Sequence, residues 1–165
     1  MKKLLVMVLV LLLAGCEQRP ELNDPEIVAR DGLVFLAHST EPLTADVFIW
    51  HVNGQLEKQF TVINGKYEGL FRTWHENGQV AGEENYVNGR QEGLSRVWHE
   101  NGQVQMEINF VNGRLEGLYR EWHENGQVAG EGNYVNNRQE GLFRTWDENG
   151  QLLLEDNYVN GEWVK

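Results

Sequence analysis

The stretch Gly65–Asn88 reads G-K-Y-E-G-L-F-R-T-W-H-E-N-G-Q-V-A-G-E-E-N-Y-V-N, and it decides the fold because the chain repeats it. The pattern returns from Gly89, Gly113 and Asn137, and a less regular copy precedes it. The period of 24 residues is visible in one column of tryptophans: Trp50, Trp74, Trp98, Trp122 and Trp146. A fixed period of this kind indicates a repeat protein in which each unit packs on its neighbours.

Two Asn-Gly dipeptides divide each copy, at Asn64-Gly65 and Asn77-Gly78 in the first regular one. An Asn-Gly pair between strand-like runs favours a two-residue type I′ turn, because both turn residues then need positive φ. Each copy therefore predicts two strands of about eight to ten residues. The fold class that follows is all-β: an elongated, single-layer antiparallel meander of repeated hairpins, with about ten to twelve strands.

The turns also predict which residues face each other across a hairpin. The pairs expected in the first hairpin are Arg72–Glu83, Trp74–Ala81, His75–Val80 and Gly69–Tyr86. The charged pair recurs as Arg96–Glu107, Arg120–Glu131 and Arg144–Glu155. Facing opposite charges stabilise a ladder by about 0.2–1 kcal/mol each. Both faces mix polar and apolar residues, which favours a largely solvated sheet that curls over a closed sandwich.

Residues 1–15 read M-K-K-L-L-V-M-V-L-V-L-L-L-A-G, with two lysines before a short apolar run. This run has the length of a signal peptide and is too short to span a bilayer. The following L-A-G-C, ending at Cys16, resembles the lipobox of bacterial lipoproteins. The resemblance implies that Cys16, the single cysteine of the chain, is lipidated. An ordinary signal peptide with a chance cysteine is the alternative.

The expected location is the cell envelope, with the lipid on Cys16 as the membrane anchor. By resemblance to Gram-negative lipoproteins, Glu17 after the cysteine implies the outer membrane, facing the periplasm. A Gram-positive source would place the protein on the outer face of the cytoplasmic membrane. Residues 16–30 are polar and acidic and hold two prolines, which predicts a tether, with a docked extended segment as the alternative. The repeat domain is expected over residues 31–165.

The repeated pattern N-G-x-x-x-G-L-x-R-x-W-x-x-N-G-Q resembles the MORN-repeat variant family, over about residues 31–165. The resemblance implies 24-residue MORN-like hairpins and an interaction protein. Many members carry the label of YwqK-type antitoxin, which implies the neutralisation of a toxin. The chain departs from the pattern at four places: Ala45, Ser95, Asn137 and Asp147. Asn137 stands where the other copies have glycine, and asparagine tolerates positive φ.

The second regular copy, from Gly89, carries an apolar face that the others lack. Val104, Met106, Ile108 and Phe110 alternate along one strand and are expected to face His99, Val97, Ser95 and Gly93. On the other side, Met106 is expected to meet Tyr119. Such a patch is either a local core or a binding surface. Our hypothesis is a partner surface formed by Val104, Met106, Ile108, Phe110 and Tyr119, with packing under the curl as the alternative.

Several classes of function are disfavoured. The net charge of −11 argues against nucleic-acid binding. The column of His51, His75, His99 and His123 cannot share a metal, because equivalent residues lie two strands, about 9.6 Å, apart. No phosphate loop, G-x-S-x-G or C-x-x-C occurs, so we predict no enzyme, no catalytic residue and no cofactor. We expect a membrane-anchored scaffold for an unknown protein partner, or alternatively an antitoxin; an acidic surface suits a basic partner.

Overall fold

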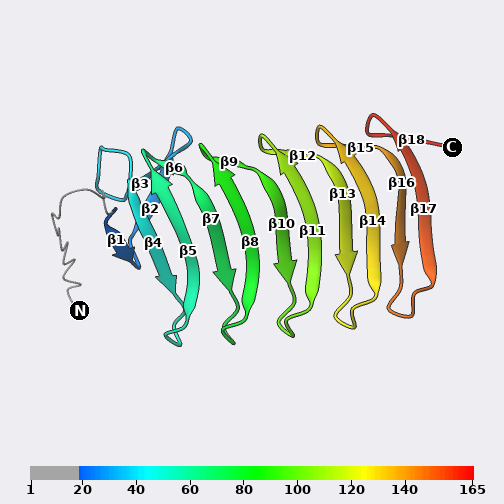
Figure 1. Cartoon of the computed structure of the whole chain (residues 1–165), viewed down its shortest axis with the longest axis horizontal. Coiled ribbons are helices and arrows are strands. Elements are labelled where there is room, and N and C mark those ends of the chain that lie inside the picture. Colours follow the sequence, from blue (N-terminus) through cyan, green and yellow to red (C-terminus); the bar gives the residue numbers. More distant parts are fainter. Residues whose placement is uncertain (1–18) are drawn as a thin grey trace.

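The computed structural model describes residues 19–165, which form one elongated sheet and a small separate hairpin. The strands stand side by side along the long axis, with β1 and β18 at opposite ends (Figure 1). The predicted all-β meander of hairpins is confirmed. The signal peptide, the lipobox and Cys16 lie outside the described residues. Within residues 19–165 no helix is long and apolar enough to cross a membrane.

The main sheet follows the chain from one neighbour to the next. Its path is β1 (Glu21–Asn23), β4 (Ala45–Trp50), β5 (Leu56–Ile63), β7 (Gly69–Trp74), β8 (Val80–Val87), β10 (Gly93–Trp98), β11 (Val104–Val111), β13 (Gly117–Trp122), β14 (Val128–Val135), β16 (Gly141–Trp146), β17 (Leu152–Val159) and β18 (Glu162–Val164). Four short strands pair beside it: β6 (Lys66–Tyr67), β9 (Arg90–Gln91), β12 (Arg114–Leu115) and β15 (Arg138–Gln139). The separate hairpin is β2 (Ile27–Arg30) and β3 (Leu33–Leu36).

The two Asn-Gly turns of each copy differ. Asn64 and Gly65 have φ of 49° and 76°, as a type I′ turn requires. At the other edge Gly78 has a φ of 83°, whereas Asn77 keeps a negative φ and its Oδ1 accepts the Gln79 N–H at 2.9 Å. The prediction of a type I′ turn here is therefore wrong, because the asparagine side chain closes a longer loop.

This longer loop changes the pairing next to it. Trp74 lies opposite Val80, and not opposite Ala81, because a bulge follows Thr73. The N–H of His75 donates to the Gln79 carbonyl, so the predicted His75–Val80 pair is also wrong. The predicted pairs from Gly69–Tyr86 to Thr73–Gly82, Arg72–Glu83 among them, are confirmed. The error is confined to the residues beside the loop.

A second shift lies beside each type I′ turn. Val111 pairs with Arg114, but Met106 then pairs with Glu121, two residues beyond the expected Tyr119. The strand breaks at Gly117, which has a φ of 88°. The predicted contact of Met106 with Tyr119 is therefore wrong, and this second strand has six residues where eight to ten were expected. Because the shift is even, each side chain stays on its predicted face.

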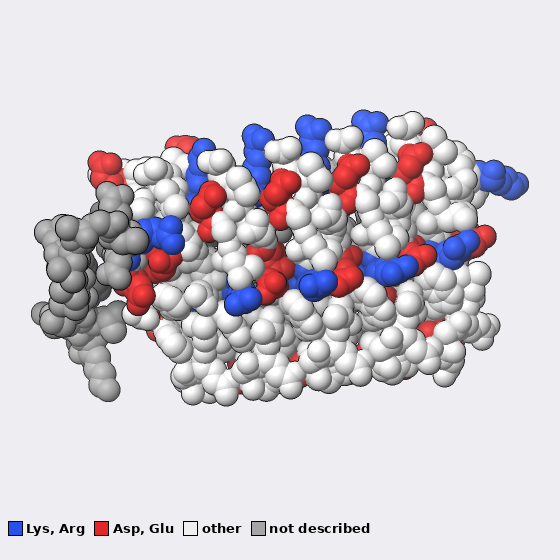
Figure 2. Space-filling model, viewed as in Figure 1, with Lys and Arg blue, Asp and Glu red and all other residues white. Residues whose placement is uncertain are grey.

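The Arg–Glu pairs form a continuous stripe across the sheet (Figure 2). Within hairpins the Arg Nε to Glu Oε distances are 2.6–2.8 Å, in the predicted pairs Arg72–Glu83, Arg96–Glu107, Arg120–Glu131 and Arg144–Glu155. Arg96, Arg120 and Arg144 also lie opposite the glutamate of the preceding copy, whereas Arg72 lies opposite Gln59. These side chains are partly exposed, so each pair contributes about 0.2–1 kcal/mol, and the stripe mainly fixes the register.

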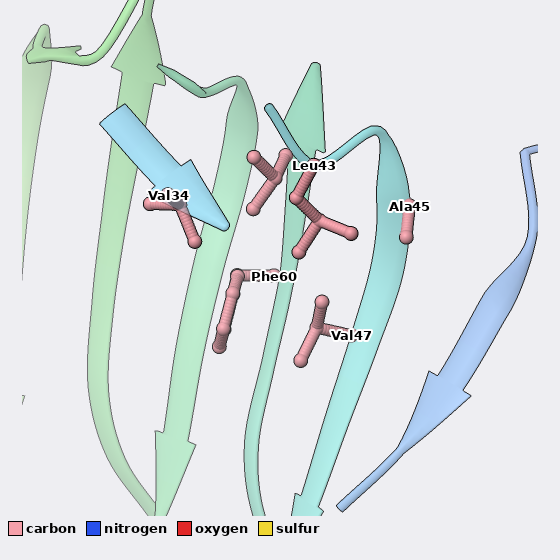
Figure 3. Close-up of a cluster of buried hydrophobic side chains, with 6 residues drawn as sticks. Val34, Leu43, Ala45, Val47 and Phe60 are labelled. Atoms are coloured by element: carbon pink, nitrogen blue, oxygen red, sulfur yellow. The ribbon is translucent and has the colours of Figure 1, made fainter. Parts of the chain in front are cut away.

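The hydrophobic core lies at the amino-terminal end of the sheet (Figure 3). The β2–β3 hairpin covers one face of β4 and β5, and the cluster contains Val34, Leu43, Ala45, Val47, Phe60 and Val62. We call this hairpin and cluster the cap. The Val34 N–H donates to the Gly65 carbonyl and the Leu43 N–H to the Val34 carbonyl, which fixes the hairpin on the sheet. The predicted single layer therefore gains a second layer at one end.

Residues 21–30, expected as part of a tether, carry two strands. β1 pairs with β4 in parallel, with Glu21 opposite Asp46, and is an exception to the antiparallel meander. β2 pairs with β3 within the cap. The docked alternative thus holds for residues 21–23 and 27–30.

Gly132 and Gly130 give a matched test of packing within one strand. A Cβ at Gly132 would lie 2.2 Å from Cε1 of Phe143, whereas a Cβ at Gly130 would meet no atom closer than 3.7 Å. We expect Gly132→Ala to lower the free energy of unfolding by about 1–3 kcal/mol, the usual cost of overpacking. Gly130→Ala should be neutral or stabilise by up to about 1 kcal/mol. Chemical denaturation measures both, and equal values would contradict the prediction.

Candidate functional site

The two faces of the sheet differ in chemistry. The charged face carries the Arg–Glu stripe. The aromatic face carries Phe71, Tyr86, Phe110, Tyr119, Tyr134, Phe143 and Tyr158. The cap packs on the aromatic face, since Phe60, Tyr67 and Phe71 all belong to or contact its cluster. Beyond β7 no described element covers that face, so it is the first place to look for a binding site.

Repeated side chains link neighbouring copies at the loop edge. Nε2 of His75 donates to the Trp98 carbonyl at 2.8 Å, and Nδ2 of Asn77 donates to the Glu100 carbonyl at 2.8 Å. The same bonds recur from His51, His99 and His123. The histidine column therefore connects one repeat to the next, and the described residues hold no cluster of metal-binding side chains.

Carboxylates link the copies at the opposite edge. Oε2 of Glu68 accepts the Asn88 N–H at 2.8 Å, and the bond recurs at Glu92, Glu116 and Glu140. In the less regular copy that precedes these, the Thr44 hydroxyl takes this role and accepts the Asn64 N–H. These four glutamates thus accept hydrogen bonds from backbone N–H groups of the turns. Their recurrence is explained by this structural role and requires no catalytic role.

Aromatic rings contact one another along the aromatic face in two separate groups. Near the cap, the Phe60 and Phe71 rings stack at 4.9 Å, and Tyr67 and Tyr86 extend the group. Towards the other end the rings meet edge to face in the pairs Tyr119–Tyr134, Tyr134–Phe143 and Phe143–Tyr158. Among the described residues no aromatic pair joins the two groups. We call the interval between them the aliphatic gap; it contains Ser95, Val97, Met106 and Ile108.

The predicted patch lies in and beside this gap. Val104, Met106, Ile108 and Phe110 lie on one side of β11, with Tyr119 on the same face of β13. The predicted pairs Ser95–Ile108, Val97–Met106 and Gly93–Phe110 are confirmed, but Val104 faces Trp98 where His99 was expected. Ser95 and Ile108 are only 5% and 7% exposed, so Ile108 fills the space above the small serine. Met106, Phe110 and Tyr119 remain half-buried and accessible.

Two carboxylates flank the aliphatic gap. Glu84 accepts the Tyr86 hydroxyl at 2.7 Å and the Gln91 amide at 2.8 Å. Glu121, which faces Met106, accepts the Tyr119 hydroxyl at 2.6 Å. Burial, followed by these hydrogen bonds, raises the pKa of both tyrosines above its usual range. Both hydroxyls therefore stay neutral donors at physiological pH.

The same face lacks cationic side chains. The register places every arginine of β7 to β17 on the charged face, and this segment contains no lysine. The aromatic face therefore combines half-buried apolar groups with acidic ones only. This combination is complementary to a ligand that presents both apolar and positively charged groups.

Two sets of exposed apolar residues were not singled out from the sequence as candidate binding residues. On the charged face the leucines and valines of successive copies form two columns, each residue 39–48% exposed: Leu70, Leu94, Leu118 and Leu142, then Val87, Val111, Val135 and Val159. At the end of the sheet, Leu152, Leu153 and Leu154 are 48%, 65% and 51% exposed. The signal for the second set was available: L-L-L stands where the first copy has V-A-G.

Comparison with known proteins finds one family. The family described as MORN repeat variant matches four consecutive segments, residues 67–88, 91–112, 115–136 and 139–160. These segments cover just over half of the chain and run in phase with the observed hairpins. No curated protein is matched.

Proposed function

The chain belongs to the MORN repeat variant family, and from this premise we propose that it is a lipid-anchored binding module of the bacterial cell envelope. Repeat proteins of one layer use extended surfaces to bind partners, because each unit adds area without adding a closed cavity. The partner proposed here is a basic protein that docks on the aromatic face.

One observation carries the proposal: the aliphatic gap separates the two groups of aromatic rings and is flanked by two carboxylates. Met106, Phe110 and Tyr119 offer apolar contact, while Glu84 and Glu121 offer charge. An apolar centre with a charged rim is the usual composition of a protein interface. The absence of arginine and lysine on β7 to β17 of this face favours a partner that supplies the cations.

Capture from cells tests the binding surface. The full-length protein is expressed in its source, crosslinked, and its partners are identified by mass spectrometry. We expect Met106→Lys to reduce capture about tenfold or more, because the lysine replaces an apolar contact and repels a basic partner. Leu118→Lys, on the charged face, should leave capture unchanged. Equal capture by the folded Met106→Lys protein would exclude this surface.

The identity of the captured partner separates two forms of the proposal. Several envelope proteins would make the module a scaffold. One stoichiometric partner whose toxicity the module relieves would make it an immunity protein, as the antitoxin label of the family suggests. Both forms use the same surface, so the Met106→Lys comparison applies to either.

The lipid anchor is tested at Cys16. Cys16→Ser removes the sulfur to which the lipid would be attached, and acyl chains contribute about 0.8 kcal/mol per buried CH₂ to membrane binding. We expect the variant to fold but to leave the membrane fraction, with a change in electrophoretic mobility. A variant that fractionates and migrates like the original protein would contradict lipidation.

A further inference from the structure

The outer edge of β17 has unpaired backbone groups. Internal long strands pair on both sides: β8 with β7 and β10, β11 with β10 and β13, and β14 with β13 and β16. β17 pairs with β16 from Leu152 to Tyr158, but on its other side β18 covers only Asn157–Val159. Among the described residues nothing pairs with the outer edge over residues 152–156. Such an edge is a ready template for another strand.

Three of the five side chains of this edge are apolar and exposed. Leu152, Leu153 and Leu154 are each about half exposed or more. Natural edges are usually protected by short strands, proline or charge. The opposite end of the sheet is protected in this way: β1 has three residues, follows Pro20, and lies beside the Arg19–Asp46 ion pair. Within residues 19–165 the two ends therefore differ: the β1 end is protected, and the β17 end is open.

The internal repeats show what such an edge accepts. In the sheet, β10 lies beside β8 and places Arg96 opposite Glu83 and Val97 opposite Gly82. Each internal glutamate of the stripe thus lies between two arginines, as Glu83 lies between Arg72 and Arg96. Glu155 has Arg144 on one side, and among the described residues no strand pairs with it on the other. The vacant position would be filled by a strand with a cation opposite Glu155 and an apolar residue opposite Leu154.

The loop between β16 and β17 makes no demand on an incoming loop, so a strand alone could occupy the edge. In earlier loops histidine and asparagine reach out to the next copy. Here Asp147 replaces the histidine, and its Oδ1 accepts the N–H groups of Asn149 and Gln151 at 2.9 and 2.8 Å. The Asn149 amide turns towards Asp147 as well. The loop is thus satisfied within itself, and an incoming segment needs no matching loop.

We propose that the outer edge of β17 is a docking site for an extended segment of the basic partner. The segment pairs antiparallel with residues 152–156, with arginine or lysine opposite Glu155 and an apolar side chain opposite Leu154. This is strand addition to a sheet edge, in which backbone bonds supply affinity and side chains supply specificity. The identity of the occupant rests on the proposed function. A second copy has only its own β17 edge to offer, which brings no cation to Glu155.

A peptide with the repeat's own strand sequence tests the site. The probe is a fluorescein-labelled peptide with the sequence of residues 90–99, R-Q-E-G-L-S-R-V-W-H, which places arginine opposite Glu155 and valine opposite Leu154 and is titrated into the full-length protein. We expect saturable one-to-one binding by fluorescence polarisation. Exchange of the peptide's central arginine for glutamate should weaken binding about tenfold. Glu155→Arg in the protein should reverse the preference between the two peptides.

Two leucine variants locate the binding. Leu154→Lys should weaken peptide binding about tenfold or more, the effect of losing one buried leucine contact. Leu142→Lys is the matched control, since Leu142 is 46% exposed but lies on a strand paired on both sides, and it should bind normally. The absence of saturable binding, or equal effects of the two variants, would overturn the proposal.

Two further results separate the possible explanations. Sedimentation equilibrium that finds a dimer, dissociated by Leu154→Lys, would assign the edge to a second copy and overturn the proposal. Undiminished capture of the cellular partner by Leu154→Lys would exclude strand docking while leaving the binding module intact. Loss of capture in both Leu154→Lys and Met106→Lys, with Leu142→Lys normal, would place the partner on the edge and on the aromatic face.

Discussion

Ile108→Glu is expected to lower the free energy of unfolding by about 3–5 kcal/mol, comparable with leaving a buried charge without a partner. Ile108 is 7% exposed and lies above Ser95. In the first copy the same column holds Glu84, which accepts hydrogen bonds from Tyr86 and Gln91. One copy later, Phe110 and Leu115 stand at those two positions, and neither side chain can donate.

The last copy follows the same rule, which makes a rescue possible. In the last copy Asp156 holds the column, and the Trp163 indole N–H donates to it at 2.8 Å. Adding Phe110→Tyr and Leu115→Gln to Ile108→Glu should therefore recover most of the lost stability, because both donors return. The double variant without the glutamate serves as the control. Chemical denaturation with hydrogen exchange on β11 gives the comparison, and failure of the rescue would contradict this account.

This result also bears on the partner surface. A charge at Ile108 alters folding, whereas a charge at the half-buried Met106 alters the surface. Loss of partner capture in Ile108→Glu would therefore carry no information about the interface. Met106→Lys is the informative variant.

Phe60→Ala is expected to cost about 3–5 kcal/mol, the range for truncating a large buried side chain. Phe60 is 3% exposed, stacks on Phe71 at 4.9 Å and meets Tyr67 edge to face at 5.3 Å. It also belongs to the cluster that holds the β2–β3 hairpin on the sheet. Its removal therefore weakens the packing of the β2–β3 hairpin on the sheet.

The effect of Phe60→Ala should be local, because repeats contact only their neighbours. Hydrogen exchange should accelerate most in β3, β4 and β5, and least in β16 and β17. Leu70→Ala is the matched control, since Leu70 is 41% exposed and its truncation should cost about 1 kcal/mol or less. Uniform acceleration along the sheet would show that the cap and the repeats unfold as one unit.

The sequence predicted the repeat, the hairpins and the Arg–Glu register, because these depend on periodicity and on turn residues. It failed where one side chain decides the local backbone. Asn77 and Asn64 both precede glycine, yet only Asn64 takes positive φ, since the Asn77 side chain caps its own loop. The two-residue shift at Gly117 has a similar origin in a single positive φ. Neither loop conformation follows from Asn-Gly alone.

The candidate site was predicted in part. The sequence placed Met106, Ile108 and Phe110 on one face and matched Ile108 with Ser95, because alternation and loop position are enough for that. It did not show that Ile108 is buried while Met106 is accessible, because that depends on the curl and on the neighbouring strand. It also missed the open β17 edge, since an edge is defined by what does not pair with it.

The cap has a consequence for the order of assembly. All the residues of its cluster lie between Val34 and Val62, so it can close before the later copies leave the ribosome or the export channel. Each later hairpin then adds to the strand before it through short-range contacts, which favour fast folding. During this growth β8, β11 and β14 are outermost in turn. At the positions of Leu153 and Leu154, β8 and β14 carry only alanine and glycine, whereas β11 carries Gln105 and Met106. The ends formed by β8 and β14 are therefore poor sites for misassociation, and the three consecutive leucines appear only when the last hairpin is in place.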